Sequence, residues 1–171
     1  MPEQRTIERA RKDKRQGKAP TTQAGEFVRE EMEHIRHGKH GARSTKQAIA
    51  IGLSKARRAG VPLPPPKKGK TSEKTRRSAE RAYAKGQTHH EGKTNPRRSR
   101  AISGVLRHEG HSAASKRALA RQAKQQSRKR TAADRSAIAR KAAHTRLAHQ
   151  THAERAAIAR KAARTRAAHR Q

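Results

Sequence analysis

The sequence predicts an all-α protein: a short helical hairpin plus separate basic Ala/Arg/Lys-rich helices, loosely packed and partly disordered. Three observations predict this class. Leu, Ile, Val and Phe together make up only 16 of 171 residues, too few for a large shared core. Ala contributes 32 residues, and Ala favours helix while it buries little apolar surface. The few larger apolar residues recur at helical spacing.

The first expected element is a basic N-terminal helix or arm over residues 1–20. Its charges alternate with single apolar residues, so we expect a solvated helix that ends near Gly17. Residues 21–60 are expected to form the helical hairpin. Gly38 is the expected stop of its first helix, and Ser44 is the expected N-cap of its second.

The two hairpin helices each carry an apolar stripe with the 3.6-residue period. The side chains expected to pack the hairpin are Phe27, Val28, Met32, Ile35, Ile49 and Leu53. On the second helix the small residues Gly52 and Ala56 would let the two helices approach closely. A hairpin of this size has a thin core. We therefore expect it to dimerise or to dock on another surface.

Acidic and imidazole side chains also lie on this hairpin. The carboxylates Glu30, Glu31 and Glu33 are expected on an exposed face, as partners for the basic segments. His34, His37 and His40 are spaced by three residues, as a metal site could use, but Gly38 is expected to end the helix before His40, and no Asp or Cys completes a tetrahedral set. We therefore expect no metal and no cofactor. No arrangement of catalytic residues stands out, so we expect no enzyme.

Residues 61–70 are rich in Pro and are expected to form a stiff linker. A basic region of helices and loops is expected over residues 71–130. Within it, an apolar cluster near Ile102 has helical spacing.

Residues 131–171 contain two basic helical repeats of 20 residues. Thr131–Gln150 reads TAADRSAIARKAAHTRLAHQ, Thr151–Arg170 reads THAERAAIARKAARTRAAHR, and 14 of 20 positions are identical. Each copy opens with a capping-box pattern, Thr131 with Asp134 and Thr151 with Glu154. Each is therefore expected to be one helix, without the continuous apolar stripe that a solenoid needs.

The charge is the strongest functional signal. The chain carries 45 Lys and Arg against 13 Asp and Glu, a formal net charge of +32, of which +24 lies in residues 61–171. Nucleic-acid phosphates attract such a chain and release counterions on contact. Phe27 and Tyr83 are the only aromatic side chains, so surfaces that stack single-stranded bases are not expected.

We therefore expect non-sequence-specific nucleic-acid binding through phosphates, with DNA favoured over RNA, in a histone-like or nucleoid-associated role. The repeats use eight Arg and two Lys, and Arg suits bidentate phosphate contacts. The candidate phosphate contacts are Arg135, Arg140, Lys141, Arg146, Arg155, Arg160, Lys161, Arg164 and Arg166.

Two alternatives remain open from the sequence. One is an RNA- or ribosome-associated basic protein. The other is an adaptor whose hairpin, residues 21–60, binds a protein partner or a second copy of the chain. No run approaches the ~18 apolar residues of a membrane span. The expected location is the cytoplasm.

The hairpin sequence QAGEFVREEMEHIRHGKHGARSTKQAIAIGLSKARRAG, followed by VPLPPPKKGK, resembles a family of small basic bacterial proteins of unknown function. Their most recognisable element is the KQAIAIGLSKAR helix, which is Lys46–Arg57 in this chain. The resemblance implies a bacterial origin, so that the expected cytoplasmic location is the bacterial nucleoid, and it brings no activity, cofactor or catalytic residue. The C-terminal repeats are similar in composition to bacterial histone-like proteins.

Overall fold

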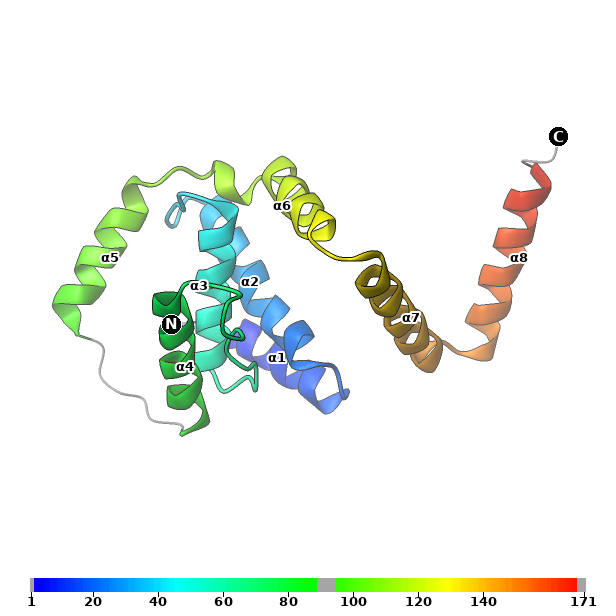
Figure 1. Ribbon diagram of the computed structural model, residues 1–171, viewed down its shortest axis with the longest axis horizontal. Helices are drawn as coiled ribbons and strands as arrows, with labels where there is room; N and C mark the ends of the chain where they lie inside the picture. Colours follow the sequence, from blue (N-terminus) through cyan, green and yellow to red (C-terminus); the bar gives the residue numbers. More distant parts are fainter. Residues whose placement is uncertain (1, 89–94, 169–171) are drawn as a thin grey trace. The chain divides into compact units, whose positions relative to one another are not determined.

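The computed structural model describes residues 2–88 and 95–168, and this part of the chain is helical with no strand, as predicted (Figure 1). It divides into two compact units, Met1–Gln122 (unit 1) and Ala123–Gln171 (unit 2). Over the described residues the elements are α1 (Gln4–Arg15), α2 (Pro20–Arg36), α3 (Thr45–Arg58), α4 (Glu73–Gln87), α5 (Pro96–His108), the 3₁₀ turn η1 (Ser112–Ala114), α6 (Lys116–Arg128), α7 (Ala132–His149) and α8 (His152–Ala168).

The centre of unit 1 is the hairpin of α2 and α3, which lie side by side (Figure 1). α2 ends at Arg36 with His37 as its C-cap, and Gly38 follows with a φ of 71°, the left-handed conformation that terminates many helices. Ser44 caps α3 and accepts a hydrogen bond from the backbone N–H of Gln47 at 3.2 Å. The stop and the cap are therefore where the sequence predicts them.

The two hairpin helices touch at Gly52. A Cβ atom on Gly52 would lie 2.7 Å from the Cα of Val28 and 3.0 Å from the carbonyl oxygen of Phe27. Both neighbours are backbone atoms of α2, so no side-chain movement could make room. The close approach predicted from the small residues of α3 is confirmed, and only glycine fits at this crossing point.

Two segments that were expected to be solvated or extended pack on the hairpin instead. α1 lies against α2 and buries Thr6 and Ala10, one helical turn apart. The Pro-rich segment after α3 buries Val61 and Leu63 in the same cluster as Ala10. Buried Arg57 donates a hydrogen bond from Nε to the carbonyl of Leu63 at 3.2 Å. The reason is the thin core of the hairpin: its apolar faces remain open until neighbouring segments cover them.

Two segments that follow the Pro-rich segment, α4 and η1, also pack on the hairpin. α4 packs on α3, and a Cβ on Gly86 would lie only 1.8 Å from the carbonyl oxygen of Arg57. The turn η1 packs against the end of the hairpin where the loop between α2 and α3 lies. Thr45 Oγ1 donates to the carbonyl of Ala113 at 2.7 Å, and Arg36 Nε donates to the carbonyl of Ala114 at 2.8 Å.

Unit 1 has two small apolar clusters in place of one core. Phe27 belongs to the first, with Leu53 packed against it at half-burial. Met32 and Ile35 belong to the second, beside the buried alanines of η1. The side chains of Val28 and Ile49 are half-buried against this second cluster. All six side chains expected to pack the hairpin therefore lie at these two clusters.

The expected exposed acidic face of α2 is wrong for two of its three residues. Glu30 is 1% exposed and Glu31 is 0% exposed, whereas Glu33 is half-buried at the surface. The physical reason is helical geometry. Glu31 lies four residues after Phe27 and four before Ile35, and this spacing places it inside the apolar stripe. The Lys55 ammonium and the His40 ring lie beside its carboxylate.

Candidate nucleic-acid interface

The candidate interface is the basic arm, defined here as α7 and α8. Each helix begins with the capping box that its sequence predicts. In α7 the Thr131 hydroxyl accepts from Asp134 N at 3.1 Å, and the Asp134 carboxylate accepts from Thr131 N at 3.2 Å. In α8 the same bonds join Thr151 and Glu154 at 3.3 and 2.8 Å. Each box satisfies two backbone N–H groups at the helix start.

The arm is exposed along its whole described length. The side chains of residues 132–148 are all exposed, and in α8 none is buried. All nine candidate phosphate contacts are exposed, four on α7 and five on α8. Even Ile138, Leu147 and Ile158 are about half exposed, at 47%, 53% and 53%. The structure thus places these cations on accessible helices, and it gives the arm no packed core of its own.

The charges of the arm are almost all of one sign. Residues 132–168 contain nine Lys and Arg against two acidic residues, a formal net charge of +7. Those two acidic residues, Asp134 and Glu154, are the capping carboxylates at the helix starts. Negative charge therefore lies where it stabilises the helix dipole, and the rest of each helix surface is positive.

The cations do not lie on one face. Because a helix turns about 100° per residue, Arg135 and Arg146 point in nearly the same direction, whereas Arg140 points about 140° away from Arg135. On α8, Arg160 and Arg164 share one side, roughly opposite Arg155, by the same geometry. Each helix therefore presents positive charge in at least two directions.

The caps make a testable prediction about the arm. We expect the double variant Thr131→Ala, Thr151→Ala to lose helix content, because each missing cap destabilises its helix by about 1 kcal/mol and the arm has no tertiary packing to compensate. Far-UV circular dichroism of the full-length protein measures this loss.

A matched control uses two threonines inside the same helices. Thr145 and Thr165 donate from their hydroxyls to the carbonyls of Lys141 and Lys161, at 2.9 and 3.1 Å, and cap nothing. Changing both to Ala should raise helix content, because Ala is the better helix former. Equal changes in the two double variants would show that the capping boxes do not stabilise the arm.

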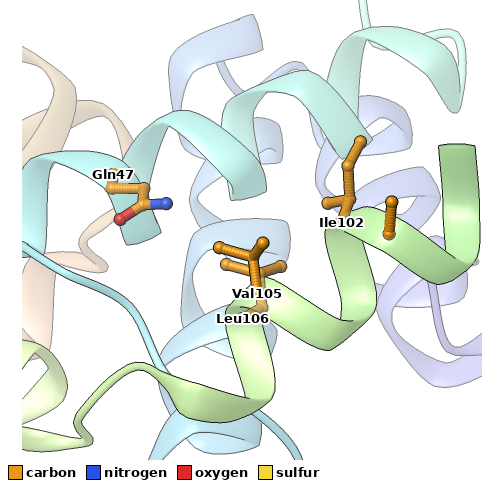
Figure 2. A pocket seen from close by; sticks show the side chains of 5 residues that line it. Gln47, Ile102, Val105 and Leu106 are labelled. Atoms are coloured by element: carbon orange, nitrogen blue, oxygen red, sulfur yellow. The ribbon is translucent and has the colours of Figure 1, made fainter.

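A different kind of surface lies in unit 1, between α5 and α3. Figure 2 shows Ile102, Val105 and Leu106 of α5 beside Gln47 of α3, and Ala101 completes the lining of this shallow pocket. Ile102 and Val105 are 50% and 61% exposed. The lining offers one amide and no charged group, so it has no chemistry for a phosphate. The phosphate-binding candidate remains the arm.

The sequence analysis did not identify one group of side chains that could form a binding site. Glu30 and Glu31 are buried beside His34 and His40, two histidines whose ring centroids are 6.1 Å apart. The expectation that Gly38 separates these histidines does not hold, because the chain turns back after α2 and brings His40 beside it. The sequence did contain one sign of this group, because Glu31 has the helical spacing of the apolar stripe of α2.

Fold and site together define an all-α protein with a small helical unit and a basic helical arm. Residues 3–68 match the model of a family described as a family of unknown function (DUF6496). The match covers α1 to α3 and most of the Pro-rich segment, which supports the resemblance to an uncharacterised family. No curated protein and no solved structure was found to be similar to this chain. Within the described residues, no helix has both the length and the apolar character required to cross a membrane.

Proposed function

We propose that this protein binds nucleic acid without base specificity, through contacts between the arm and the phosphate backbone. We further propose that its target is DNA rather than RNA. The observation that carries the proposal is the set of nine exposed Lys and Arg side chains on two capped helices whose only acidic residues serve as caps. Exposed cations gain from counterion release without a large burial penalty. This is the pattern of a backbone binder, which positions itself on phosphates and reads no bases.

The distribution of the cations around each helix favours coating or condensing DNA. A helix with positive charge in two directions holds phosphates of one backbone on one side and leaves cations free on the other. A second duplex can then be held by the same helix, so that two duplexes approach each other. This is the basis for proposing a histone-like, nucleoid-associated role in a bacterial cell.

The test is a salt titration of the full-length protein against duplex DNA and duplex RNA of equal length. If roughly eight phosphate contacts form at once, log K should fall with log salt with a slope near −7. A slope near zero would exclude the mechanism. Preference for A-form RNA in direct competition would replace DNA with RNA as the target, and the protein would then be an RNA- or ribosome-associated factor.

The alternative of an adaptor protein is less well supported, because little apolar surface of the hairpin is left for a partner. The apolar faces of α2 and α3 are already covered by α1, α4, η1 and the Pro-rich segment. A protein partner or a second copy of the chain would have to use other side chains of the hairpin. Salt-independent DNA binding, together with concentration-dependent dimerisation, would favour this alternative over the arm.

A further inference from the structure

Buried charge marks a second site, in unit 1 and independent of the arm. Glu30 and Glu31 are adjacent carboxylates at 1% and 0% exposure, and three of their four oxygens have no hydrogen-bond partner of normal geometry. Burying a carboxylate is unfavourable unless a cation compensates it. Lys55 supplies one charge, with Nζ 2.6 Å from Glu31 Oε2 and 3.9 Å from Glu30 Oε1. One ammonium group is thus shared between two buried anions.

His40 shows where a second cation fits. Its Nδ1 lies 3.0 Å from the carbonyl oxygen of Gly41, and because a carbonyl only accepts, Nδ1 carries the hydrogen. Its Nε2 faces Glu31 Oε1 at 3.3 Å. With a hydrogen on Nδ1, either a proton on Nε2 or a bound metal cation must lie between Nε2 and the carboxylate oxygen, because two lone pairs would otherwise face each other. A backbone carbonyl on the far nitrogen is also the usual partner that orients a metal-bound histidine.

His34 closes the group from the same helix. It follows Glu31 by three residues and Glu30 by four, so all three share one side of α2. One ligand atom from each of Glu31, His34 and His40 lies within 4.8 Å of the others. A tetrahedral zinc site has ligand atoms about 3.3 Å apart, because its bonds are about 2.0 Å long. The pair of Glu31 Oε1 and His40 Nε2 already has this spacing at 3.3 Å, and a ligand atom of His34 lies within 4.8 Å of one from each.

A second carboxylate pair stands beside His34. Glu3 Oε1 lies 2.8 Å from His34 Nε2 and 2.8 Å from Lys39 Nζ, and Glu30 Oε1 accepts from the backbone N–H of Glu3 at 3.1 Å. Glu30 Oε2 remains without a hydrogen-bond partner. Three carboxylates thus meet two lysines and two imidazoles. With neutral imidazoles the group has a formal charge of −1, which a bound divalent cation changes to +1.

We propose that Glu31, His34 and His40 bind a divalent transition-metal ion of the Zn²⁺ class, with Glu30, Glu3 or water in the fourth position. Two imidazoles and one carboxylate are ligands that suit zinc and its neighbours and not the oxygen-seeking Mg²⁺ or Ca²⁺. The ion would tie the C-terminal half of α2 to the loop that leads into α3. Such a tie suits a unit whose two apolar clusters consist largely of alanine.

The test uses full-length protein treated with a chelator and then dialysed. We expect calorimetric titration with ZnCl₂ at pH 7.5 to show one tight equivalent. The melting temperature of unit 1 should rise by roughly 5–15 °C at a hundredfold excess over Kd. CoCl₂ should give the intense visible bands of a tetrahedral site. MgCl₂ should not compete.

The histidines provide matched variants. His34→Gln and His40→Gln should each weaken Zn²⁺ binding by at least tenfold. Residues that only hydrogen-bond to a metal ligand already change metal affinity by about tenfold or more, so the loss of a ligand itself should cost at least as much. His37→Gln removes an exposed histidine from the same segment and should change nothing. Equal binding by all three variants, or no tight equivalent in the wild type, would overturn the proposal and leave an ion-pair network with a protonated His40. If the variants fail to fold, the Co²⁺ spectrum of the wild type decides alone.

Discussion

Replacing all nine candidate phosphate contacts of the arm with glutamine is expected to weaken DNA binding by at least about 10³-fold at moderate salt, a loss comparable to what six to ten phosphate contacts undergo when salt rises from about 50 to 200 mM. Glutamine keeps the helix and removes only the charge. The slope of log K against log salt should become shallower by about 0.9 for each phosphate that is no longer neutralised. Fluorescence anisotropy with labelled duplex, measured over a salt series, gives both quantities.

The control removes the same charge from unit 1. The nine exposed cations suitable for it are Arg11, Lys12, Lys14, Arg15, Arg58, Lys67, Lys68, Lys70 and Lys74. Both variants lower the formal net charge from +32 by nine. If affinity depends only on total charge, the two variants will bind DNA equally weakly, and the arm has no special role. A much larger effect in the arm variant would locate the binding surface on α7 and α8.

Gly52→Ala is expected to destabilise unit 1 by about 1–3 kcal/mol, the usual range for overpacking. The new Cβ would lie 2.7 Å from the Cα of Val28, so the two hairpin helices must move apart. This destabilisation outweighs the preference of alanine over glycine in a helix, about 1 kcal/mol. Urea unfolding followed by circular dichroism at 222 nm measures the difference.

Gly25→Ala is the matched control, a helical glycine of α2 with nothing within 4 Å of the added Cβ. It should stabilise unit 1 by about 0.5–1 kcal/mol, because only the backbone effect remains. Stabilisation by both substitutions would mean that the hairpin packs less closely than the structure shows. Opposite signs would locate the tight crossing at Gly52.

Local features could be predicted from the sequence because they depend on neighbours along the chain. The capping boxes at Thr131 and Thr151, the cap at Ser44 and the stop at Gly38 each involve residues within one or two turns. The close approach at Gly52 followed from side-chain size alone. The nine arm cations are exposed because their helices lack an apolar stripe, which is also visible in the sequence.

Long-range packing could not be predicted in this way. The sequence suggested an exposed acidic face, but Glu31 lies in the apolar stripe of α2, and Lys55 and His40 stand around it. His40 approaches α2 only because the loop after Gly38 turns back. The local sequence of η1 does not predict that Ala113 and Ala114 are buried against the end of the hairpin.

Composition, capping residues and charge were enough to define the all-α class, the capped starts of α3, α7 and α8, the stop of α2 at Gly38, and the basic arm with its exposed cations. These properties follow from propensity, capping and electrostatics, which act over short distances or through total charge. The folded chain was needed to show that α1, the Pro-rich segment, α4 and η1 cover the hairpin, and that buried carboxylates meet two histidines there. The reason is that alanine-rich faces specify their partners weakly, so their packing depends on the shape of the assembled backbone.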